Sequence, residues 1–446
     1  METYFIQTYG CQMNKHDSER VAGMLENMGM VAVDTPNKAD VVVFMTCCVR
    51  EKADVRLKGV VSSLKYAKQA SPSMIIAVGG CIGQRDGQKL VEQIGHIDVV
   101  FGTQNIKELP SLIQAAHDSK APQVSVKEVS DDFASDLPTH RESPYHAWLP
   151  ITVGCDNFCS YCVVPYVRGR ERSRELDDIV TEATKLVADG VQEITLLGQN
   201  VNSYGRDLYG EPRFAEVLKA VSATGIKRLG FATSHPKDLT DETIEAMAEL
   251  DNCLDYLHLP FQSGSNTILK EMNRVYTREE YKRLIDKIKA AMPSIALSTD
   301  IIVGFPGETE QDFLDTLSLY EYCQFDQAFT FIYSPREGTP AATMPNQISD
   351  EIAQERFQRL VACVQKCAYE KNQTTLDTVQ SVLIEGTSKR DETKLVSRSR
   401  QNKVVHFGVP AGREVDDLMG KIAHVRIDHA QTWFLSGTFI DIESEG

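Results

Sequence analysis

The chain has 446 residues, of which 42% are hydrophobic and 25% are charged, and its formal net charge is -16. This length suggests two or three domains, and the composition is typical of a soluble globular protein rather than a disordered one. No apolar run reaches the roughly 18–20 residues that span a bilayer. The opening sequence METYFIQTYG has no basic region followed by an apolar stretch, so we expect a cytoplasmic protein without membrane contact.

The first segment, residues 1–119, alternates short apolar runs with amphipathic stretches. Its predicted strands lie at 4–8, 41–45 and 74–78, and its predicted helices at 18–28 and 49–68. Alternation of this kind predicts a Rossmann-like α/β domain with a parallel sheet. Residues 120–142 are polar and rich in turn formers, and we interpret them as a linker.

The α/β alternation resumes over residues 143–372, where strands are predicted at 149–153, 193–197, 228–232, 256–259, 297–303 and 328–332. Six β/α units predict a partial (β/α)6 barrel, with reactive groups on the loops that follow the strands. The last segment, residues 375–442, has short β-rich runs at 381–385, 404–407, 422–427 and 434–440. We expect a small antiparallel β-barrel there.

The strongest motif is GCDNFCSYC at residues 154–162, which places three cysteines within eight residues directly after a predicted strand. Structural zinc sites normally use four ligands, and no further Cys or His lies close by, so a zinc loop is the weaker alternative. A [4Fe–4S] cluster held by three cysteines leaves one iron open to a small molecule. We therefore expect a cluster at Cys155, Cys159 and Cys162.

Three other cysteines, Cys11, Cys47 and Cys81, each follow a predicted strand and are 36 and 34 residues apart. Ligands of open α/β sheets bind outside the carboxyl ends of the strands, so neighbouring strands would bring these thiols together in a second cluster site. Cys48 competes with Cys47 as the ligand, and we prefer Cys47 because it lies nearer the strand end. We expect the remaining cysteines to pack in the core as small hydrophobic residues: Cys253, Cys323, Cys363 and Cys367.

Nearly the whole chain resembles the methylthiotransferase family of radical S-adenosylmethionine (SAM) enzymes. The resemblance rests on TYGCQMN at 8–14, TC at 46–47, GC at 80–81, the cysteine loop with VVPYVRG at 163–169, and LPFQSGS at 259–265. One departure is Met45, where the family usually has Asn before its Thr-Cys pair. The C-terminal segment is similar to the RNA-binding barrel of this family, known as TRAM.

The resemblance implies that Cys155, Cys159 and Cys162 hold the cluster that binds SAM, and that Cys11, Cys47 and Cys81 hold an auxiliary cluster that delivers sulfur. The implied reaction uses two SAM and two [4Fe–4S] clusters to add a methylthio group to C2 of an adenosine at tRNA position 37. The wording YGCQMN and CVVPYVRG favours N6-isopentenyladenosine as the substrate. Threonylcarbamoyladenosine in tRNA and an aspartate of a ribosomal protein are alternatives within the family, and a non-catalytic iron–sulfur RNA-binding protein is an alternative of another class.

Several residues at predicted strand ends are candidates for binding SAM. Polar side chains on a late strand, Ser298 and Asp300, are placed to meet a ribose, and a glycine directly after that strand allows the backbone to approach a ligand closely. The sequence LGQN at 197–200 ends another strand and is suited to the methionyl portion. The candidate set is Tyr161, Gly198, Gln199, Ser298, Asp300, Gly304 and Glu308.

The negative net charge means that RNA binding requires local clusters of basic residues. Two basic stretches, residues 168–174 and 389–403, meet this requirement and would grip an anticodon stem while the loop bases are splayed. The expected RNA contacts are Arg168, Arg170, Arg398, Arg400 and Lys403. A small electron donor such as flavodoxin or ferredoxin is an expected partner, and we expect a monomer.

Overall fold

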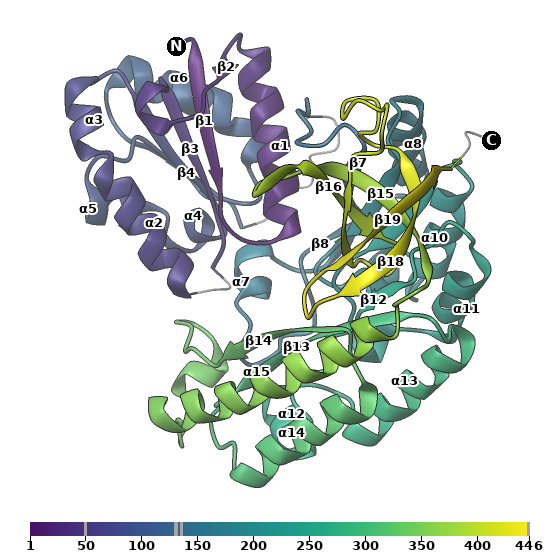
Figure 1. The fold of residues 1–446 in the computed structure, drawn as a ribbon. Coiled ribbons are helices and arrows are strands. Elements are labelled where there is room, and N and C mark those ends of the chain that lie inside the picture. Colours follow the sequence, from purple (N-terminus) through teal and green to yellow (C-terminus); the bar gives the residue numbers. More distant parts are fainter. Residues whose placement is uncertain (49–50, 129–132, 134–136, 444–446) are drawn as a thin grey trace.

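The computed structural model describes residues 1–48, 51–128, 133 and 137–443. Figure 1 shows an N-terminal domain (β1 to β6), a central domain (β7 to α15) and a C-terminal barrel (β15 to β19) that lies against the central domain. No helix within these described ranges is long and apolar enough to cross a membrane.

A six-stranded parallel sheet in the order β2-β1-β3-β4-β5-β6 forms the N-terminal domain, as the α/β alternation predicts. Along β3, alternate side chains enter different cores, with Val42 and Phe44 on one face and Val41 and Val43 on the other. The strands are β1 (Thr3–Thr8), β2 (Val31–Ala32), β3 (Val41–Thr46), β4 (Ile75–Gly80), β5 (Val99–Phe101) and β6 (Gln123–Ser125). The sheet therefore extends into residues 120–142, which we expected to be a linker, because β6 pairs with β5.

Helices cover both faces of this sheet, so each face buries its own apolar cluster. The first face is covered by α2 and α5, and the second by α1 and α6. The helices are α1 (Gln12–Asn27), α2 (Glu51–Ser63), α3 (Lys65–Ala70), α4 (Cys81–Asp86), α5 (Gln88–Ile94) and α6 (Leu109–Ser119).

The central domain is the predicted partial barrel of six parallel β/α units. Two three-stranded sheets, β11-β10-β7 and β12-β13-β14, are joined by a parallel bridge between Leu229 and Cys253. The strands are β7 (His146–Pro150), β10 (Glu193–Leu197), β11 (Arg228–Phe231), β12 (Tyr256–His258), β13 (Ala296–Val303) and β14 (Gln327–Ile332). The strand expected at 149–153 is interrupted after Pro150, and β8 (Thr152–Val153) pairs instead with β9 (Arg172–Ser173).

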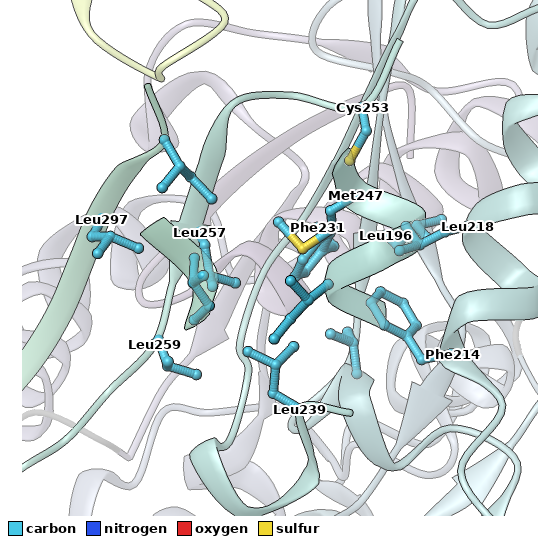
Figure 2. Close-up of a cluster of buried hydrophobic side chains, with 14 of the residues drawn as sticks. Leu196, Phe214, Leu218, Phe231, Leu239, Met247, Cys253, Leu257, Leu259 and Leu297 are labelled. Carbon is cyan, nitrogen blue, oxygen red and sulfur yellow. The ribbon is translucent and has the colours of Figure 1, made fainter. Parts of the chain in front are cut away.

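Amphipathic helices pack around the outside of these strands and bury one continuous core. Figure 2 shows part of it, where Leu196 and Phe231 on strands meet Phe214 and Met247 on helices. The helices are α7 (Val164–Arg168), α8 (Leu176–Ala188), α9 (Arg206–Tyr209), α10 (Phe214–Ser222), α11 (Asp241–Glu249), α12 (Asn266–Glu271), α13 (Arg278–Ala291), α14 (Glu310–Cys323) and α15 (Asp350–Gln373).

Five strands close the C-terminal barrel in the order β15-β16-β17-β19-β18. One of them, β16, was not predicted, because its first half is charged and exposed and only Leu395, Ser397 and Ser399 turn inward. The strands are β15 (Val379–Ser388), β16 (Asp391–Ser399), β17 (Val404–Gly408), β18 (Ile422–Ala430) and β19 (Leu435–Ile442).

Helix α7 joins the first two domains. It follows the cysteine loop of the central domain, yet Val163, just before its first residue, and Val167 within it are buried in the apolar core of the N-terminal domain. Burial of a valine side chain contributes about 1.5–3 kcal/mol. The loop that carries Cys155, Cys159 and Cys162 is therefore fixed against the domain that carries the other three cysteines.

The barrel docks on the amino-terminal ends of the central strands through the loop that connects β16 to β17. Arg400 pairs with Asp255 at 2.9 Å, just before β12, and Lys403 pairs with Asp326 at 2.7 Å, just before β14. Arg228, the first residue of β11, donates to the carbonyl oxygens of Arg398 and Ser399 at 3.2 and 3.1 Å. Two residues of the basic stretch 389–403, Arg400 and Lys403, thus hold the barrel to the central domain.

Candidate active site

Three of the predicted cysteines lie at the carboxyl ends of the adjacent strands β1, β3 and β4. Cys11 precedes α1, Cys47 follows β3, and Cys81 begins α4. Gly10, with a φ of +122°, lets the loop before Cys11 approach the loop that carries Cys47, since a Cβ on Gly10 would lie 2.3 Å from the Cβ of Cys47. The sheet topology therefore brings together thiols that are 36 and 34 residues apart in the sequence.

Two buried polar side chains fix the three loops relative to one another. The side-chain amide of Asn14 donates to the carbonyl oxygens of Tyr9 and Thr46, each at 2.8 Å. The hydroxyl of Thr46 donates to the carbonyl of Gly79 at 2.6 Å and accepts from the amide of Ile82 at 3.1 Å. Sequence reasoning missed the role of Asn14, although it stands within the TYGCQMN motif.

The electrostatics of this site favour thiolates, which are the form that binds metal. A hydrogen bond from Cys47 lowers the pKa of Cys11 to about 6, with desolvation opposing this shift and Arg168 adding to it. A hydrogen bond from Cys48 lowers the pKa of Cys81 to about 7, again against burial and with support from Arg168. Cys48 is buried and its own pKa is raised, first by its hydrogen bond to Cys81 and then by burial.

The second thiol set lies on the loop that follows β8. The amide of Cys155 donates to the carbonyl of Gly169 at 3.2 Å, and that of Cys162 donates to the carbonyl of Cys159 at 2.9 Å. The amide of Ser160 donates to the carbonyl of Met272, which directly follows α12, at 3.0 Å. Burial raises the pKa of Cys155 to about 11 and that of Cys162 to about 12, so binding of a metal here would release protons.

A buried arginine that sequence reasoning missed lies behind this loop. Arg274 places Nη1 3.7 Å from the sulfur of Cys159 and donates to the carbonyl of Pro260 at 2.6 Å and to the hydroxyl of Tyr276 at 2.9 Å. It is 115 residues from Cys159 in sequence, and no local motif distinguishes it. It therefore brings a buried positive charge to the site of the second thiol set.

Gly154 determines the path of the cysteine loop, because its φ is +85° and a Cβ on it would lie 2.0 Å from the carbonyl oxygen of Arg170. We expect Gly154→Ala to displace the loop and reduce the iron bound after anaerobic reconstitution from about eight to about four atoms per chain, the content of one [4Fe–4S] cluster. Gly190→Ala is the matched control, since Gly190 has a φ of +88° in open space. Full iron content in Gly154→Ala would contradict this role.

Four of the predicted SAM-binding residues lie beside the cysteine loop or at the barrel rim. The Gln199 side chain accepts a hydrogen bond from the amide of Gly154 at 2.5 Å, and a Cβ on Gly198 would lie 2.2 Å from the hydroxyl of Thr152. Tyr161 packs against the apolar cluster around Phe305. Gly304, with a φ of +72°, directly follows β13.

The other three candidates are engaged with protein groups. Ser298 is fully buried in the first half of β13 and bonds to Tyr256 at 2.6 Å and His258 at 2.8 Å, too deep in the strand to belong to the rim. Asp300 lies 3.6 Å from His258. Glu308 accepts from Arg356 at 2.8 Å and from the amide of Gly304 at 3.1 Å, which identifies it as a structural link to α15.

A group of buried polar atoms without hydrogen-bond partners lies at the rim of the central barrel. Buried side-chain oxygen or nitrogen atoms without a hydrogen-bond partner occur in β8 and just after β10, β11 and β14, on the side of the barrel that carries the cysteine loop. They belong to Thr152, Asn200, Asn202, Ser234 and Tyr333. Because buried polar groups are nearly always paired, these atoms fit a polar small molecule such as SAM at the carboxyl ends of the strands.

The donor set of each site fits an iron–sulfur cluster. Each site presents three cysteine side chains, and thiolates are the usual ligands of such clusters.

The basic residues expected to contact RNA lie in different environments. Arg168 is buried and bonded to Asp17, and Arg400 and Lys403 form ion pairs that hold the barrel to the central domain. Arg398 pairs with Glu385 at 2.9 Å on the barrel surface. Arg170 stays exposed, pairs with Asp156 and lies over the ring of Phe158.

Comparison with known proteins agrees with this arrangement. The Radical SAM superfamily model matches residues 149–320, and the model described as "Uncharacterized protein family UPF0004" matches residues 3–102. The radical S-adenosylmethionine methyltransferase TsrM of Kitasatospora setae has a similar fold, with a TM-score of 0.55 and 14% identity over 77% of this chain and 75% of that chain. Fold and cysteine loop together define a radical SAM protein.

Curated relatives are similar over almost the whole length. The tRNA-2-methylthio-N(6)-dimethylallyladenosine synthase of Thermoanaerobacter sp. is 49% identical over 98% of this chain and 93% of its own. The protein of the same name from Carboxydothermus hydrogenoformans is 46% identical over 98% and 99%. The chain belongs to the family of tRNA-2-methylthio-N(6)-dimethylallyladenosine synthases. This membership confirms the predicted class of enzyme and its cofactors, SAM and [4Fe–4S] clusters.

Proposed function

We propose that this protein adds a methylthio group to C2 of N6-isopentenyladenosine at position 37 of tRNA. The observation that carries the proposal is the pairing of two three-thiol sites, one at the carboxyl ends of β1, β3 and β4 and one on the loop that follows β8, in domains that α7 fastens together. A C–H bond of an aromatic ring has no acidic proton for a side chain to remove, so the hard chemistry must come from cofactors. The names of the relatives supply the substrate.

We assign Cys155, Cys159 and Cys162 to the cluster that binds SAM, and Cys11, Cys47 and Cys81 to the auxiliary cluster. When bound, these groups supply the radical chemistry and the sulfur that replace the C2 hydrogen. The protein orients the reactants and excludes water: Gln199 fixes the cysteine loop through Gly154, and Asn14 fixes the auxiliary site. The pKa of the Cys48 thiol is raised by its hydrogen bond to Cys81 and by burial, which disfavours a thiolate there and supports Cys47 as the ligand.

For SAM we retain Tyr161, Gly198, Gln199, Asp300 and Gly304 as candidate contacts. The unpaired polar atoms at the same rim extend this set by Thr152, Asn200, Asn202, Ser234 and Tyr333.

For tRNA we propose the exposed basic side chains that have no docking role in the protein. On the barrel these are Lys389, Arg390 and Lys394, and beside the cysteine loop Arg170. Trp433 and Phe434 are exposed at another part of the barrel, next to the pair of Val405 on β17 and Leu435 on β19, and their rings are suited to stacking on unpaired bases. RNA binding is compatible with a net charge of -16, because these basic side chains are clustered on small parts of the surface where they can contact phosphates.

The test uses the full-length protein, reconstituted anaerobically with iron and sulfide, with SAM and a chemical reductant. Three anticodon stem-loops are compared, carrying N6-isopentenyladenosine, threonylcarbamoyladenosine or unmodified adenosine at position 37. We expect the mass shift of a methylthio group in place of hydrogen only with the first. Turnover of the threonylcarbamoyl substrate alone would overturn the assignment, and SAM cleavage without modification of any RNA would point to a different substrate, such as an aspartate of a ribosomal protein.

We further propose that a flavodoxin- or ferredoxin-like protein supplies the electron, that the enzyme works as a monomer, and that it resides in the cytoplasm. The electron donor is proposed because the SAM-binding cluster must be reduced, and the cytoplasm is proposed because the substrate is tRNA.

A further inference from the structure

Arg168 connects the two cysteine sites. It is the last residue of α7, six positions after Cys162, and only 4% of its surface is exposed. Its Nη2 donates to the side-chain oxygen of Asn14 at 2.8 Å and to the carboxylate of Asp17 at 3.1 Å. Both partners lie on α1 of the N-terminal domain, so a side chain from the SAM-binding loop ends inside the auxiliary site.

The guanidinium brings a buried positive charge to the auxiliary thiols. It contributes to the lowered pKa of Cys11 and Cys81, and its partner Asn14 also donates to the carbonyl oxygens of Tyr9 and Thr46, which precede the first two auxiliary cysteines. Asp17 supplies a buried negative charge beside the guanidinium, and its carboxylate also lies 3.6 Å from His16. Buried charges interact far more strongly than charges in water, so both groups contribute to the potential at the sulfurs.

We propose that Arg168 is a positioning residue that sets the reduction potential of the auxiliary cluster, with Asp17 acting in the opposite direction. The inference rests on the proposed function, because it assumes a cluster at Cys11, Cys47 and Cys81. The potential of an iron–sulfur cluster depends on its net charge, its solvent exposure and the hydrogen bonds to its sulfurs. Reduction adds one negative charge, which a buried guanidinium stabilises and a buried carboxylate disfavours.

A purely structural role is the alternative, since Arg168 also crosses the domain boundary. Arg20 offers a matched control. It lies on the same helix α1, is buried, and crosses the same boundary to Glu182 of α8 at 2.8 Å. Arg20 follows Cys11 by nine residues on α1. Its guanidinium bonds to Glu182, His16 and the carbonyl of Leu137, whereas that of Arg168 bonds to Asn14 and Asp17. Loss of Arg20 therefore removes an interdomain ion pair without removing the charge beside the thiols.

The experiment uses the full-length chain with Cys155, Cys159 and Cys162 replaced by alanine, so that only the auxiliary cluster is reconstituted. Its midpoint potential is measured by redox titration followed by electron paramagnetic resonance, and iron is quantified in the same samples. We expect Arg168→Met to shift the potential to more negative values, Arg168→Lys to restore part of the shift, and Asp17→Asn to shift it to more positive values. Arg20→Met should leave the potential of the parent protein unchanged.

Unchanged potentials in both Arg168→Met and Asp17→Asn, with about four irons retained, would overturn the inference and leave the proposed function intact. A parent protein that binds no iron would overturn the auxiliary cluster itself, and the inference with it. If Arg168→Met fails to bind a cluster, the sign of the shift in Asp17→Asn decides: a positive shift supports the inference, and no shift or a negative one overturns it.

Discussion

Replacing Cys11, Cys47 and Cys81 together by alanine is expected to lower the iron content of the reconstituted protein from about eight to about four atoms per chain, since each [4Fe–4S] cluster contributes four. Methylthiolation of tRNA should be lost completely, because the auxiliary thiols hold the proposed sulfur source. Reductive cleavage of SAM should persist, because Cys155, Cys159 and Cys162 are on a separate loop. Iron and sulfide analysis, together with detection of 5′-deoxyadenosine, measures both effects.

The matched control for this triple variant is Cys253→Ala/Cys323→Ala/Cys363→Ala, which removes three cysteines of the central domain away from both loops. Cys253 and Cys323 are buried in its apolar core, and Cys363 packs against that core. This control should keep about eight irons and its activity. Four irons in the parent protein and in the auxiliary variant alike would show that the N-terminal thiols bind no cluster.

The largest expected effect on stability comes from Arg228, which is 2% exposed and pairs with Glu193 at 2.7 Å. Because it also donates to two carbonyl groups of the barrel, Arg228→Met should remove these two hydrogen bonds and leave the buried carboxylate of Glu193 without its arginine partner. Removing one member of a buried ion pair costs about 3–5 kcal/mol. We expect a loss of that size in the free energy of unfolding, together with loosening of the barrel.

Urea denaturation followed by tryptophan fluorescence can resolve this effect. The chain has 2 tryptophans, Trp148 in the central domain and Trp433 in the barrel, so Trp433→Phe isolates the first signal. Arg426→Met is the control, since its pair with Asp428 is exposed and should contribute at most about 1 kcal/mol. Adding Glu193→Gln to Arg228→Met should recover part of the loss, because contacting residues are not additive. Equal midpoints for Arg228→Met and Arg426→Met would contradict this view.

The sequence predicted the elements whose signals are local. Residues 193–197 are a strand in both the prediction and the structure, because a short, mainly apolar run between two helical stretches indicates a strand without tertiary information. The loop with Cys155, Cys159 and Cys162 could be found from its local spacing, and Cys11, Cys47 and Cys81 could be placed together because the carboxyl ends of parallel strands meet at one edge of a sheet. Met45, where the sequence departs from the family pattern, has its side chain buried in the core on the α1 face of the sheet.

What the sequence could not show is how deep a residue lies and which distant residues it pairs with. Ser298 lies on the predicted strand, but periodicity does not show how far along β13 a polar side chain belongs to the rim. Arg400 and Lys403 looked like RNA contacts because their acidic partners, Asp255 and Asp326, are 145 and 77 residues away. The same distance in sequence concealed Arg274, which lies 115 residues from Cys159.

The packing of α7 has a consequence for exchanging domains between relatives. Two family models divide the chain into separate modules, at residues 3–102 and 149–320, and α7 falls in the second. Its neighbours in space are nevertheless in the first, where Val163 and Val167 complete an apolar core. A chimera that joins the N-terminal domain of one homologue to the barrel of another must therefore take residues 163–168 from the N-terminal parent, although a boundary drawn from sequence would assign them to the other.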